Sequence, residues 1–596
     1  MNRSGSAWDA LWGRWIVEEL VRNGITFFCI SPGSRSTPLT VSVAENSRAQ
    51  SKVCIDERAA AYFALGYARA TGRAAVLIAT SGTAVANHLP AIVEASMEHI
   101  PMIVLTADRP PELHDCGAPQ TIEQNGIFGA YVRWFHNPGC PGSEMPVEAL
   151  LSTIDYAVQR TKAPLAGPVH LNVPFREPFL AHSETTAKTT PITVPQSWQS
   201  SDAPYICWAT AQKSPDKTIL DALVQARPHR GILSVGRIPI TAQPAVKRLA
   251  EVLHWPLFAD VASGMRLGTD CTERIAYSDS LLLAIGDDKA WQPEAIWHLG
   301  FPPLSKRLLT FLEKSTAPQK VWIADHSLRH DPTHCFSWRV ESDLSAFCDA
   351  CIDGLVGLRC ATSPWIEQWQ SLDMQTDTLM ARHFDTVVLR DTTSIPSEAH
   401  LAHFLSQQVP NEHGFFIGNS LPARMINGYG SGRGTTARVA LNRGASGIDG
   451  LIASAAGYAE GLRQPVTLLI GDLSTLHDLN SLALLENSAF PVFVVLCNNQ
   501  GGGIFSFLPI AEQRRDLFEP FFGTPHQCSF RAASQSFGLD YYAADSLADF
   551  KRFYRAAVSR ARSTVIEVST ERTANVVEEQ RWHDFFLANL RWSTSA

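Results

Sequence analysis

Short apolar runs alternate with stretches of helical periodicity along the first third of the chain. The runs are GITFFCIS, KVCID, AAVLIATS, PMIVLTAD and GPVHLNVP. Strands that are apolar on both faces and separated by helices indicate a parallel sheet covered by helices on both sides. We therefore predict one α/β domain over residues 1–182.

The same pattern returns twice after a polar segment. Residues 183–204 are rich in Ser, Thr and Pro and are typical of a linker. Apolar runs resume with RGILSVGR, WPLFADV, SLLLAIGD and KVWIADH, and again with GFFIGNS, PVTLLIGD, FPVFVVLCNN and STVIEVS. They predict a central domain over 205–360 and a third over 361–596. The fold class is therefore α/β, with three doubly wound domains and mainly parallel sheets.

Composition limits the partners of the protein. A net charge of −8, with 18% charged residues, gives no basic surface for nucleic acid or an anionic membrane. The start of the chain is amphipathic, and no uncharged apolar run is long enough to span a bilayer. The 12 cysteines are scattered, and the single C-x-x-C at Cys348 and Cys351 lacks the further ligands of a zinc site. We expect a cytoplasmic protein whose anionic ligands are met by local clusters of cations.

Two acids, Asp56 and Glu57, stand between a strand-like run and an alanine-rich helical pattern. Ligands bind at such strand-to-helix corners in α/β sheets. An acid there also complements the positive end of the helix, and from these residues alone that simpler explanation is favoured.

The third domain has a second candidate site. One strand ends at Gly471-Asp472, and the next along the chain ends at Asn498-Asn499, before three glycines. Neighbouring parallel strands end at the same edge of a sheet, so Asp472 and Asn499 could face one cavity. Their oxygens and the Gly501 carbonyl suit Mg²⁺, with Mn²⁺ as an alternative, although these residue types also favour turns.

Together these features resemble the thiamine diphosphate enzymes. The resemblance implies a pyruvate oxidase/decarboxylase-like architecture and a homodimer or tetramer with active sites between subunits. It makes Glu57 the catalytic residue, hydrogen-bonded to the aminopyrimidine of a cofactor whose diphosphate lies in a neighbouring subunit. A buried carboxylate has a raised pKa and can share a proton with a ring nitrogen. The cofactor-binding residues implied are Glu57, Ile448, Gly471, Asp472, Leu473, Ser474, Asn499, Gly501, Ile504 and Phe505.

Longer motifs narrow the resemblance to the 2-succinyl-5-enolpyruvyl-6-hydroxy-3-cyclohexene-1-carboxylate synthases. They include SPGSRSTPLT, DERAAAYFALGYARATG, LTADRPPELHDCGAPQTIEQ, GNSLPARMI, NRGASGIDGL and GDLSTLHDLNSLALL, with LSKRLLTFL in the middle domain. The family reaction implied is decarboxylation of 2-oxoglutarate, followed by conjugate, Stetter-like addition of the succinyl-semialdehyde carbanion to isochorismate. It belongs to menaquinone or phylloquinone biosynthesis.

Both of these substrates are dianions, and arginine binds a carboxylate through two hydrogen bonds. The resemblance places Ser420 and Arg424 beside the part derived from 2-oxoglutarate, and a second group nearer isochorismate. Ile448 would hold the cofactor bent, and an apolar wall would limit contact with water. The substrate-binding residues implied are Ser34, Arg35, Arg109, Gln120, Lys306, Arg307, Ser420, Arg424, Arg443 and Leu508. The isochorismate group is Arg35, Gln120, Lys306 and Arg307, and the wall is Ile504, Phe505 and Leu508.

Two positions depart from the family pattern, and alternatives stay open. Leu473 stands where the wider superfamily has a glycine, and Pro119 has neither a side-chain amide nor a backbone donor, so it is assigned no substrate contact. Another thiamine diphosphate-dependent 2-oxo acid decarboxylase or carboligase, or a non-catalytic homologue, would share the fold. A dinucleotide-dependent dehydrogenase is disfavoured, because no G-x-G-x-x-G opens a βαβ unit.

Overall fold

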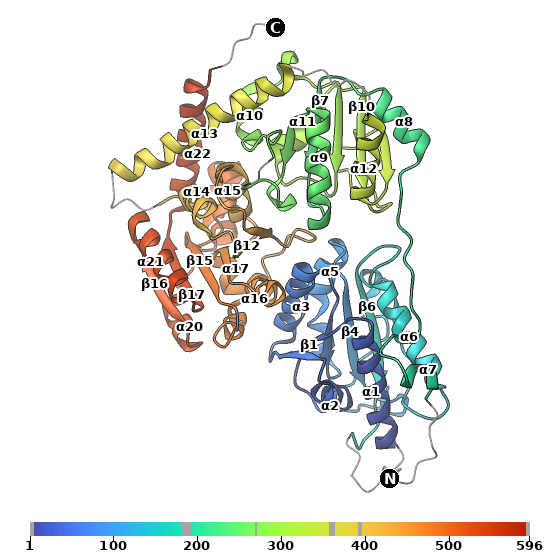
Figure 1. The fold of residues 1–596 in the computed structure, drawn as a ribbon. Coiled ribbons are helices and arrows are strands. Elements are labelled where there is room, and N and C mark those ends of the chain that lie inside the picture. The colour runs from blue at the N-terminus through green and yellow to red at the C-terminus, as the bar shows by residue number, and fades with distance from the viewer. Residues whose placement is uncertain (1–4, 180–193, 269–270, 357–363, 391–395, 592–596) are drawn as a thin grey trace.

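Three separate sheets follow one another along the chain in the computed structural model, each between layers of helices (Figure 1). The structure describes residues 5–179, 194–268, 271–356, 364–390 and 396–591. Every strand pairing within the three sheets is parallel. The predicted three-part α/β architecture is confirmed.

The N-terminal sheet has six strands in the order β2-β1-β3-β4-β6-β5. Its strands are β1 (Phe27–Ile30), β2 (Gln50–Val53), β3 (Ala75–Ala79), β4 (Met102–Asp108), β5 (Phe135–His136) and β6 (Pro168–Pro174). Its main helices are α1 (Gly5–Arg22), α2 (Thr37–Glu45), α3 (Glu57–Thr71), α5 (Leu89–Met97) and α6 (Val147–Arg160). The edge strand β2 is largely exposed, unlike the buried run that its sequence predicts.

The central sheet has five strands in the order β11-β10-β9-β7-β8. They are β7 (Gly231–Val235), β8 (Leu257–Ala259), β9 (Ala295–Leu299), β10 (Gln319–Ala324) and β11 (Trp338–Glu341). Its main helices are α8 (Lys217–Gln225), α9 (Gln243–Leu253), α10 (Ser278–Ile285), α11 (Lys306–Lys314) and α12 (Leu344–Leu355).

One strand prediction in this domain is wrong. The run SLLLAIGD forms helix α10 instead, and the strand is AIWHL, which is β9. A short apolar run does not distinguish a buried strand from a buried helix by itself. The helix places Leu281, Leu282 and Ile285 in the core, and its first turn holds Asp279, which suits the positive helix start.

The C-terminal sheet has six strands in the order β13-β12-β14-β15-β17-β16. They are β12 (Gly414–Ile417), β13 (Arg438–Ala440), β14 (Val466–Gly471), β15 (Val492–Asn498), β16 (Asp540–Ala544) and β17 (Thr564–Ser569). Its main helices are α14 (Glu398–Gln408), α15 (Leu421–Tyr429), α16 (Leu451–Leu462), α17 (Asp472–His477), α20 (Phe530–Ser536), α21 (Leu547–Arg560) and α22 (Arg572–Asn589), and α13 (Pro364–Arg390) precedes them. Among the helices described, none combines the length and apolar character that crossing a membrane requires.

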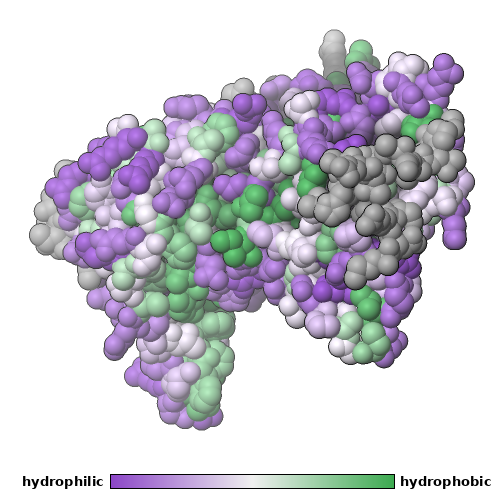
Figure 2. Space-filling model, turned by 90° about the horizontal axis from the view of Figure 1, so that it is seen from below, coloured by the Kyte–Doolittle hydropathy of each residue, from purple (hydrophilic) through white to green (hydrophobic). Residues whose placement is uncertain are grey.

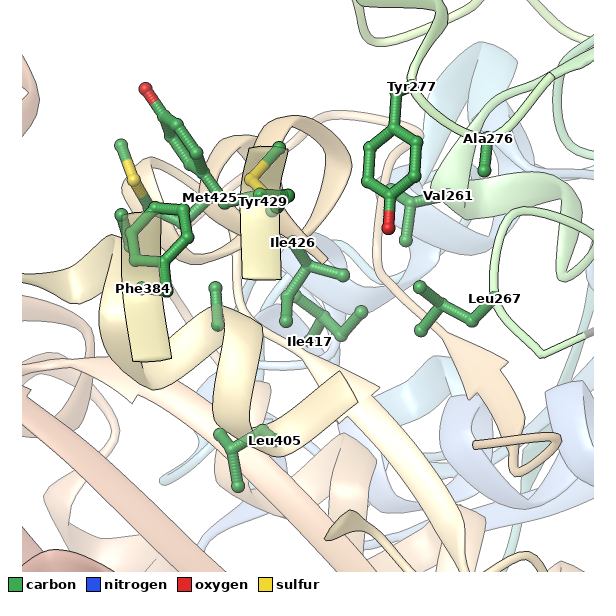
Figure 3. Close-up of a cluster of buried hydrophobic side chains, with 14 of the residues drawn as sticks. Val261, Leu267, Ala276, Tyr277, Phe384, Leu405, Ile417, Met425, Ile426 and Tyr429 are labelled. Atoms are coloured by element: carbon green, nitrogen blue, oxygen red, sulfur yellow. The ribbon is translucent and has the colours of Figure 1, made fainter. Parts of the chain in front are cut away.

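The C-terminal domain shares a hydrophobic core with each of the other two. One core joins α3 and the N-terminal sheet to α16 and β14. Another joins the central domain to α14 and α15, and Figure 3 shows Tyr277 and Leu267 of the central domain near Ile426 and Ile417 of the C-terminal domain. These shared cores hold the three domains in a defined arrangement.

Helices α3 and α16 cross with their backbones in contact. A Cβ on Gly66 would lie 2.0 Å from the Ser454 carbonyl oxygen, and one on Gly457 would lie 1.9 Å from that of Phe63. Only glycine permits such close approach. The crossing places the start of α3 against the C-terminal domain of the same chain.

Part of the predicted linker is packed rather than extended. Residues 183–193 lie outside the described part of the chain, but α7 (Gln196–Gln199) and the following residues dock on the N-terminal domain. Glu19 accepts hydrogen bonds from the Trp198 indole and from Tyr205 N, and Asp155 accepts one from Ile206 N at 2.7 Å. The exact domain boundaries stay predictions.

Candidate active site

The carboxyl edge of the C-terminal sheet brings the predicted metal ligands near one another. Asp472 directly follows β14, and Asn499 directly follows the adjacent strand β15. Asp472 Oδ2 accepts a hydrogen bond from Gly501 N at 2.9 Å, and its Oδ1 accepts one from Leu473 N at 2.7 Å. Ser474 is buried in the same first turn of α17.

Asn499 has a fixed orientation in this group. Its Nδ2 donates to Glu398 Oε1 at 2.8 Å, and its Oδ1 is buried without a hydrogen-bond partner among the described residues. A carboxylate oxygen can only accept, so the amide group and not the carbonyl must face Glu398. Glu398 Oε1 also accepts from Asn575 Nδ2 at 2.9 Å.

The electrostatics favour a bound cation. Burial raises the pKa of Asp472, which the Gly501 and Leu473 N–H groups and His526 partly counter; His526 Nε2 lies 3.3 Å from Asp472 Oδ2. Burial raises the pKa of Glu398 to about 7, and Asp472 adds to the shift. Two buried carboxylates and an unpartnered amide oxygen form a set of hard oxygen donors, which fits a divalent ion such as Mg²⁺.

The glycine loop after β15 is closely packed. Gly501 has φ +142°, and a Cβ there would lie 1.9 Å from the Gly523 carbonyl oxygen. The Gly501 carbonyl oxygen, which we predicted as a metal ligand, accepts from Gly503 N at 2.9 Å. The loop is thus held close to Asp472 by backbone contacts that a side chain at Gly501 would prevent.

A cavity of about 940 Å³ lies between the central and C-terminal domains. Its walls come from α10, α11, α15, α22 and the 3₁₀ turn Gly503–Phe507. Six residues predicted from the sequence line it: Lys306, Arg307, Arg424, Ile504, Phe505 and Leu508. Residues far apart in the sequence and of the predicted chemistry therefore meet in one space.

The cations of this cavity are not equivalent. Arg307 is already paired, because its Nη1 lies 2.6 Å from Asp279 Oδ2 and its Nη2 lies 3.2 Å from His583 Nε2. Lys306 is exposed at the start of α11. Arg424 is exposed too and donates to the Ser420 carbonyl oxygen at 2.8 Å.

Although Arg424 is exposed, partial desolvation by the protein around its guanidinium lowers its pKa, and nearby Arg443 adds to the shift. Two cations held close together are suited to a dianionic ligand. Ser420 itself has φ +69°, a strained backbone conformation of the kind that clusters at functional sites.

Glu57 is the first residue of α3. The preceding Asp56 caps this helix by accepting from Ala59 N at 3.1 Å, so the simple helix-end role belongs to Asp56. Glu57 is half-buried, and its Oε2 accepts from Asn87 Nδ2 at 3.3 Å. The next residue, Arg58, donates to the His477 carbonyl oxygen at 2.8 Å, at the end of α17.

The remaining predicted residues of the N-terminal domain form a separate group near the carboxyl ends of its strands. Arg35 is buried, donates to the Phe175 carbonyl oxygen at 2.9 Å and pairs with Glu177 at 3.1 Å. Arg109 is close enough to contribute to the lowered pKa of Arg35, for which burial is the main cause. Ser34 is exposed, and Gln120 donates to the Ser81 carbonyl oxygen at 2.9 Å. None of this group is among the described residues that line the cavity.

Arg443 and Ile448 lie in the loop before α16. Arg443 Nη1 donates to Asn419 Oδ1 at 3.0 Å. Ile448 is 36% exposed, so it is not an ordinary core isoleucine. The side chain is available to contact a ligand.

Several residues of these sites were not predicted from the sequence. Glu398, Asn575 and His526 surround the predicted metal ligands, and Asp279, Glu579 and His583 surround Arg307. Each is a single polar residue within a helical or loop pattern. None of them belongs to a sequence motif such as the Gly-Asp and Asn-Asn pairs, so the sequence alone did not point to them.

Comparison with known families agrees with this architecture. Residues 12–127 match the thiamine pyrophosphate enzyme N-terminal TPP binding domain, 192–417 the middle domain of thiamine pyrophosphate enzymes, and 435–568 the C-terminal TPP binding domain. The three matched segments each contain one of the three sheets or most of it.

Full-length relatives carry a more specific name. The 2-succinyl-5-enolpyruvyl-6-hydroxy-3-cyclohexene-1-carboxylate synthase of Rubrobacter xylanophilus is 43% identical over 95% of this chain and 96% of its own length. The synthases of the same name from Chlorobium phaeobacteroides and Salinibacter ruber are each 42% identical; both matches cover 96% of this chain, and they cover 96% and 97% of the relatives.

Proposed function

The chain belongs to the 2-succinyl-5-enolpyruvyl-6-hydroxy-3-cyclohexene-1-carboxylate synthase family of thiamine diphosphate-dependent enzymes, and we propose that it catalyses the reaction of that name. It decarboxylates 2-oxoglutarate and adds the remaining four-carbon unit to isochorismate by conjugate addition, with release of CO₂. The product is an intermediate of menaquinone or phylloquinone biosynthesis.

One observation carries the choice of substrates. The cavity combines the cations Lys306 and Arg424 with the apolar residues Ile504, Phe505 and Leu508. Cations bind the carboxylates of two dianions, and an apolar wall limits contact of a reactive carbon with water. Arg307 lines the same cavity, and its ion pair with Asp279 fixes the position of its guanidinium.

The cofactor is held by residues of the C-terminal domain. Asp472, Asn499 and Gly501 would hold Mg²⁺, with Mn²⁺ as an alternative, and such an ion would neutralise charge on the diphosphate. Thiamine diphosphate, when bound, supplies the carbon nucleophile and the electron sink. Gly471, Leu473 and Ser474 would contact the diphosphate, and Ile448 would support the cofactor in a bent conformation.

Glu57 provides the proton relay of the reaction. With the cofactor bound, its carboxylate would accept a hydrogen bond from, and exchange a proton with, the aminopyrimidine. Ser420, Arg424 and Arg443 bind the carboxylates of 2-oxoglutarate. Arg35, Gln120, Lys306 and Arg307 receive isochorismate, and Ser34 and Arg109 add further substrate contacts.

The working unit is a homodimer or tetramer in the cytoplasm, in which Glu57, Ser34, Arg35, Arg109 and Gln120 complete the site of a partner copy. None of these five residues of the N-terminal domain is among the described residues that line the cavity of the same chain, which supports the arrangement. Exposed apolar side chains beside Glu57 support it too, since Val53 is 60% and Ile55 88% exposed. Figure 2 shows apolar residues gathered near the middle of one face of the molecule.

The reaction is tested by following isochorismate absorbance with purified protein, thiamine diphosphate, Mg²⁺ and 2-oxoglutarate. We expect consumption that requires every component and that falls by about 10²–10⁴-fold in Glu57→Gln, because this change removes the proton exchange. If the wild type releases CO₂ from 2-oxoglutarate or pyruvate but leaves isochorismate untouched, the acceptor is wrong. If a folded, cofactor-bound wild type turns over no 2-oxo acid, the protein is a non-catalytic homologue.

A further inference from the structure

Two acids of the N-terminal domain contact the loop that carries Arg443 and Ile448. Glu94 lies in α5, and Glu98 follows the end of that helix. Four residues apart, they lie on the same side of the helix. They are almost completely buried, with exposures of 2% and 1%.

These two carboxylates accept three consecutive backbone N–H groups of the C-terminal domain. Glu94 accepts from Gly444 N at 2.7 Å and from Ala445 N at 2.6 Å, one through each oxygen. Glu98 accepts from Arg443 N at 3.0 Å. Burial, with Glu98 nearby, raises the pKa of Glu94 to about 7, and the Ala445 and Gly444 N–H groups partly counter this shift. Because each oxygen of Glu94 accepts one of two successive N–H groups, the backbone of the loop is held on α5.

The sequence of the loop suits this contact. A Cβ on Gly444 would lie 2.7 Å from the Glu94 carbonyl oxygen and 2.9 Å from Met97 Cβ. Any side chain there would push the loop away from α5. The glycine of NRGASG is therefore explained by the approach of the loop to the helix.

Glu98 also connects the loop to the other two domains. It pairs with Arg69 of α3, which donates in addition to Asn442 Oδ1 at 3.1 Å. Arg237 of the central domain lies 3.5 Å from Glu98 Oε1 and donates to the Glu98 carbonyl oxygen at 2.8 Å. The loop is thus tied to α3, the helix that begins with Glu57, and to the central domain.

The loop also has an anchor within its own domain. Asn419 Nδ2 donates to the carbonyl oxygens of Asn442 and Gly447, each at 2.7 Å, while its Oδ1 accepts from Arg443. The backbone and the Arg443 side chain are therefore set by contacts on both sides of the loop.

We infer that Glu94 and Glu98 are positioning residues for the reaction: by holding the backbone of residues 443–445 on α5, they direct Arg443 to the substrate and Ile448 to the cofactor. The inference rests on the proposed function for the roles of Arg443 and Ile448. It adds two residues, one in α5 and one directly after it, that touch neither substrate nor cofactor.

The test is Glu94→Gln in the full-length protein. Glutamine has one acceptor oxygen, and its amide faces the second backbone N–H, so one loop hydrogen bond is lost. We expect about tenfold weaker binding of thiamine diphosphate and an about tenfold higher KM for 2-oxoglutarate, with a smaller change in kcat. Hydrogen exchange should rise in a peptide covering residues 442–449. Gly444→Ala should cause the same changes in cofactor binding, KM and hydrogen exchange, because its side chain would push the loop away from α5.

Asp331→Asn is the matched control. Asp331 is buried and accepts from Thr333 N and His334 N, each at 3.0 Å, in a central-domain loop without any proposed site residue. It should leave KM, cofactor binding and exchange at 442–449 unchanged.

The inference is overturned if Glu94→Gln and Gly444→Ala both raise hydrogen exchange at 442–449 but leave cofactor binding and KM unchanged, since the contact is then structural only. It is also overturned if the control reproduces the kinetic change, or if neither variant alters exchange. A wild type that does not turn over 2-oxoglutarate and isochorismate would overturn the proposed function instead. Thiamine diphosphate affinity and hydrogen exchange would still decide the role of the two acids.

Discussion

Two adjacent asparagines show how a neighbouring side chain decides what a residue can do. Asn498 and Asn499 each donate a side-chain amide hydrogen to a glutamate, Glu567 at 2.7 Å and Glu398 at 2.8 Å. The side-chain oxygen of Asn498, Oδ1, accepts from Gln500 N at 3.0 Å. That of Asn499 is buried without a partner in the described structure, and so it is the one free to bind a metal.

Replacing Glu398 by glutamine should weaken metal binding. The new amide can donate to the Asn499 carbonyl oxygen and turn it away from Asp472. We expect Mg²⁺ affinity to fall by about 10–100-fold, as for other residues that orient metal ligands. The bound metal is first removed with a chelator. The thermal midpoint of unfolding is then measured at increasing Mg²⁺ concentration, in the presence of thiamine diphosphate, to give the Mg²⁺ affinity.

Glu567→Gln is the control for this prediction, because it changes the same kind of contact one residue away. It should leave the Mg²⁺ titration unchanged, although the Tyr541 hydroxyl also donates to Glu567 at 2.6 Å and stability can fall. An equal loss of Mg²⁺ affinity in both variants would contradict a specific role for Glu398.

The sequence predicted the metal ligands better than their surroundings. Asp472 and Asn499 each end a strand, so parallel topology alone placed them at one edge. Glu398 lies 101 residues before Asn499 and opens an ordinary helix, so no spacing connects the two. Arg307 matched a family motif, but the sequence could not show that Asp279 would lie 2.6 Å from it.

At the scale of elements, the segment that includes α7 and residues up to 206 is bound to the N-terminal domain through two buried acids, Glu19 and Asp155. Burial raises the pKa of Glu19 to about 8, and a hydrogen bond with Asp155 adds to the shift. A carboxyl with a raised folded-state pKa stabilises the fold fully below its unfolded pKa of about 4.5, and this contribution is lost as pH rises through about 8.

The wild type should therefore lose stability relative to Glu19→Gln as pH rises. Glutamine does not titrate, so the difference in thermal midpoint between the two proteins isolates Glu19. We expect the thermal midpoint of the wild type to fall relative to that of Glu19→Gln as pH rises from about 5 to about 8.5. A difference that is constant over the range would show that Glu19 is not held in its neutral form.

Element prediction failed where local pattern and tertiary context disagree. The apolar residues of α10 form a run that reads equally as strand or helix, and only packing between α11 and α13 decides it. Strand β2 was recognised, but its position at the sheet edge, which exposes it, depends on strand order and not on its residues.

At the scale of the whole molecule, subunit sharing of the active site can be tested by complementation. Glu57→Gln and Asp472→Asn should each be inactive. In a mixed dimer, one site would combine the intact Glu57 of one chain with the intact Asp472 of the other. After the two variants are unfolded and refolded together, activity should return to about one quarter of the wild type.

Equal amounts of each variant, refolded separately and then combined without exchange, provide the control. If co-refolding yields mixed dimers, shown by two different affinity tags, but no activity, Glu57 and Asp472 serve the site of the same chain. The contact between Arg58 and His477 within one chain makes this alternative a concrete one.

The contact of Glu94 and Glu98 with the loop at residues 443–445 also affects the order in which the protein is assembled during synthesis. Glu98 and the Arg443 N–H that it accepts are 345 residues apart along the chain. At a synthesis rate of roughly 5–20 residues per second, the N-terminal domain waits roughly 20–70 s for its partner loop to emerge from the ribosome. During that interval Glu94 and Glu98 have no loop to hold, so this part of the proposed active site forms only after most of the chain has been synthesised.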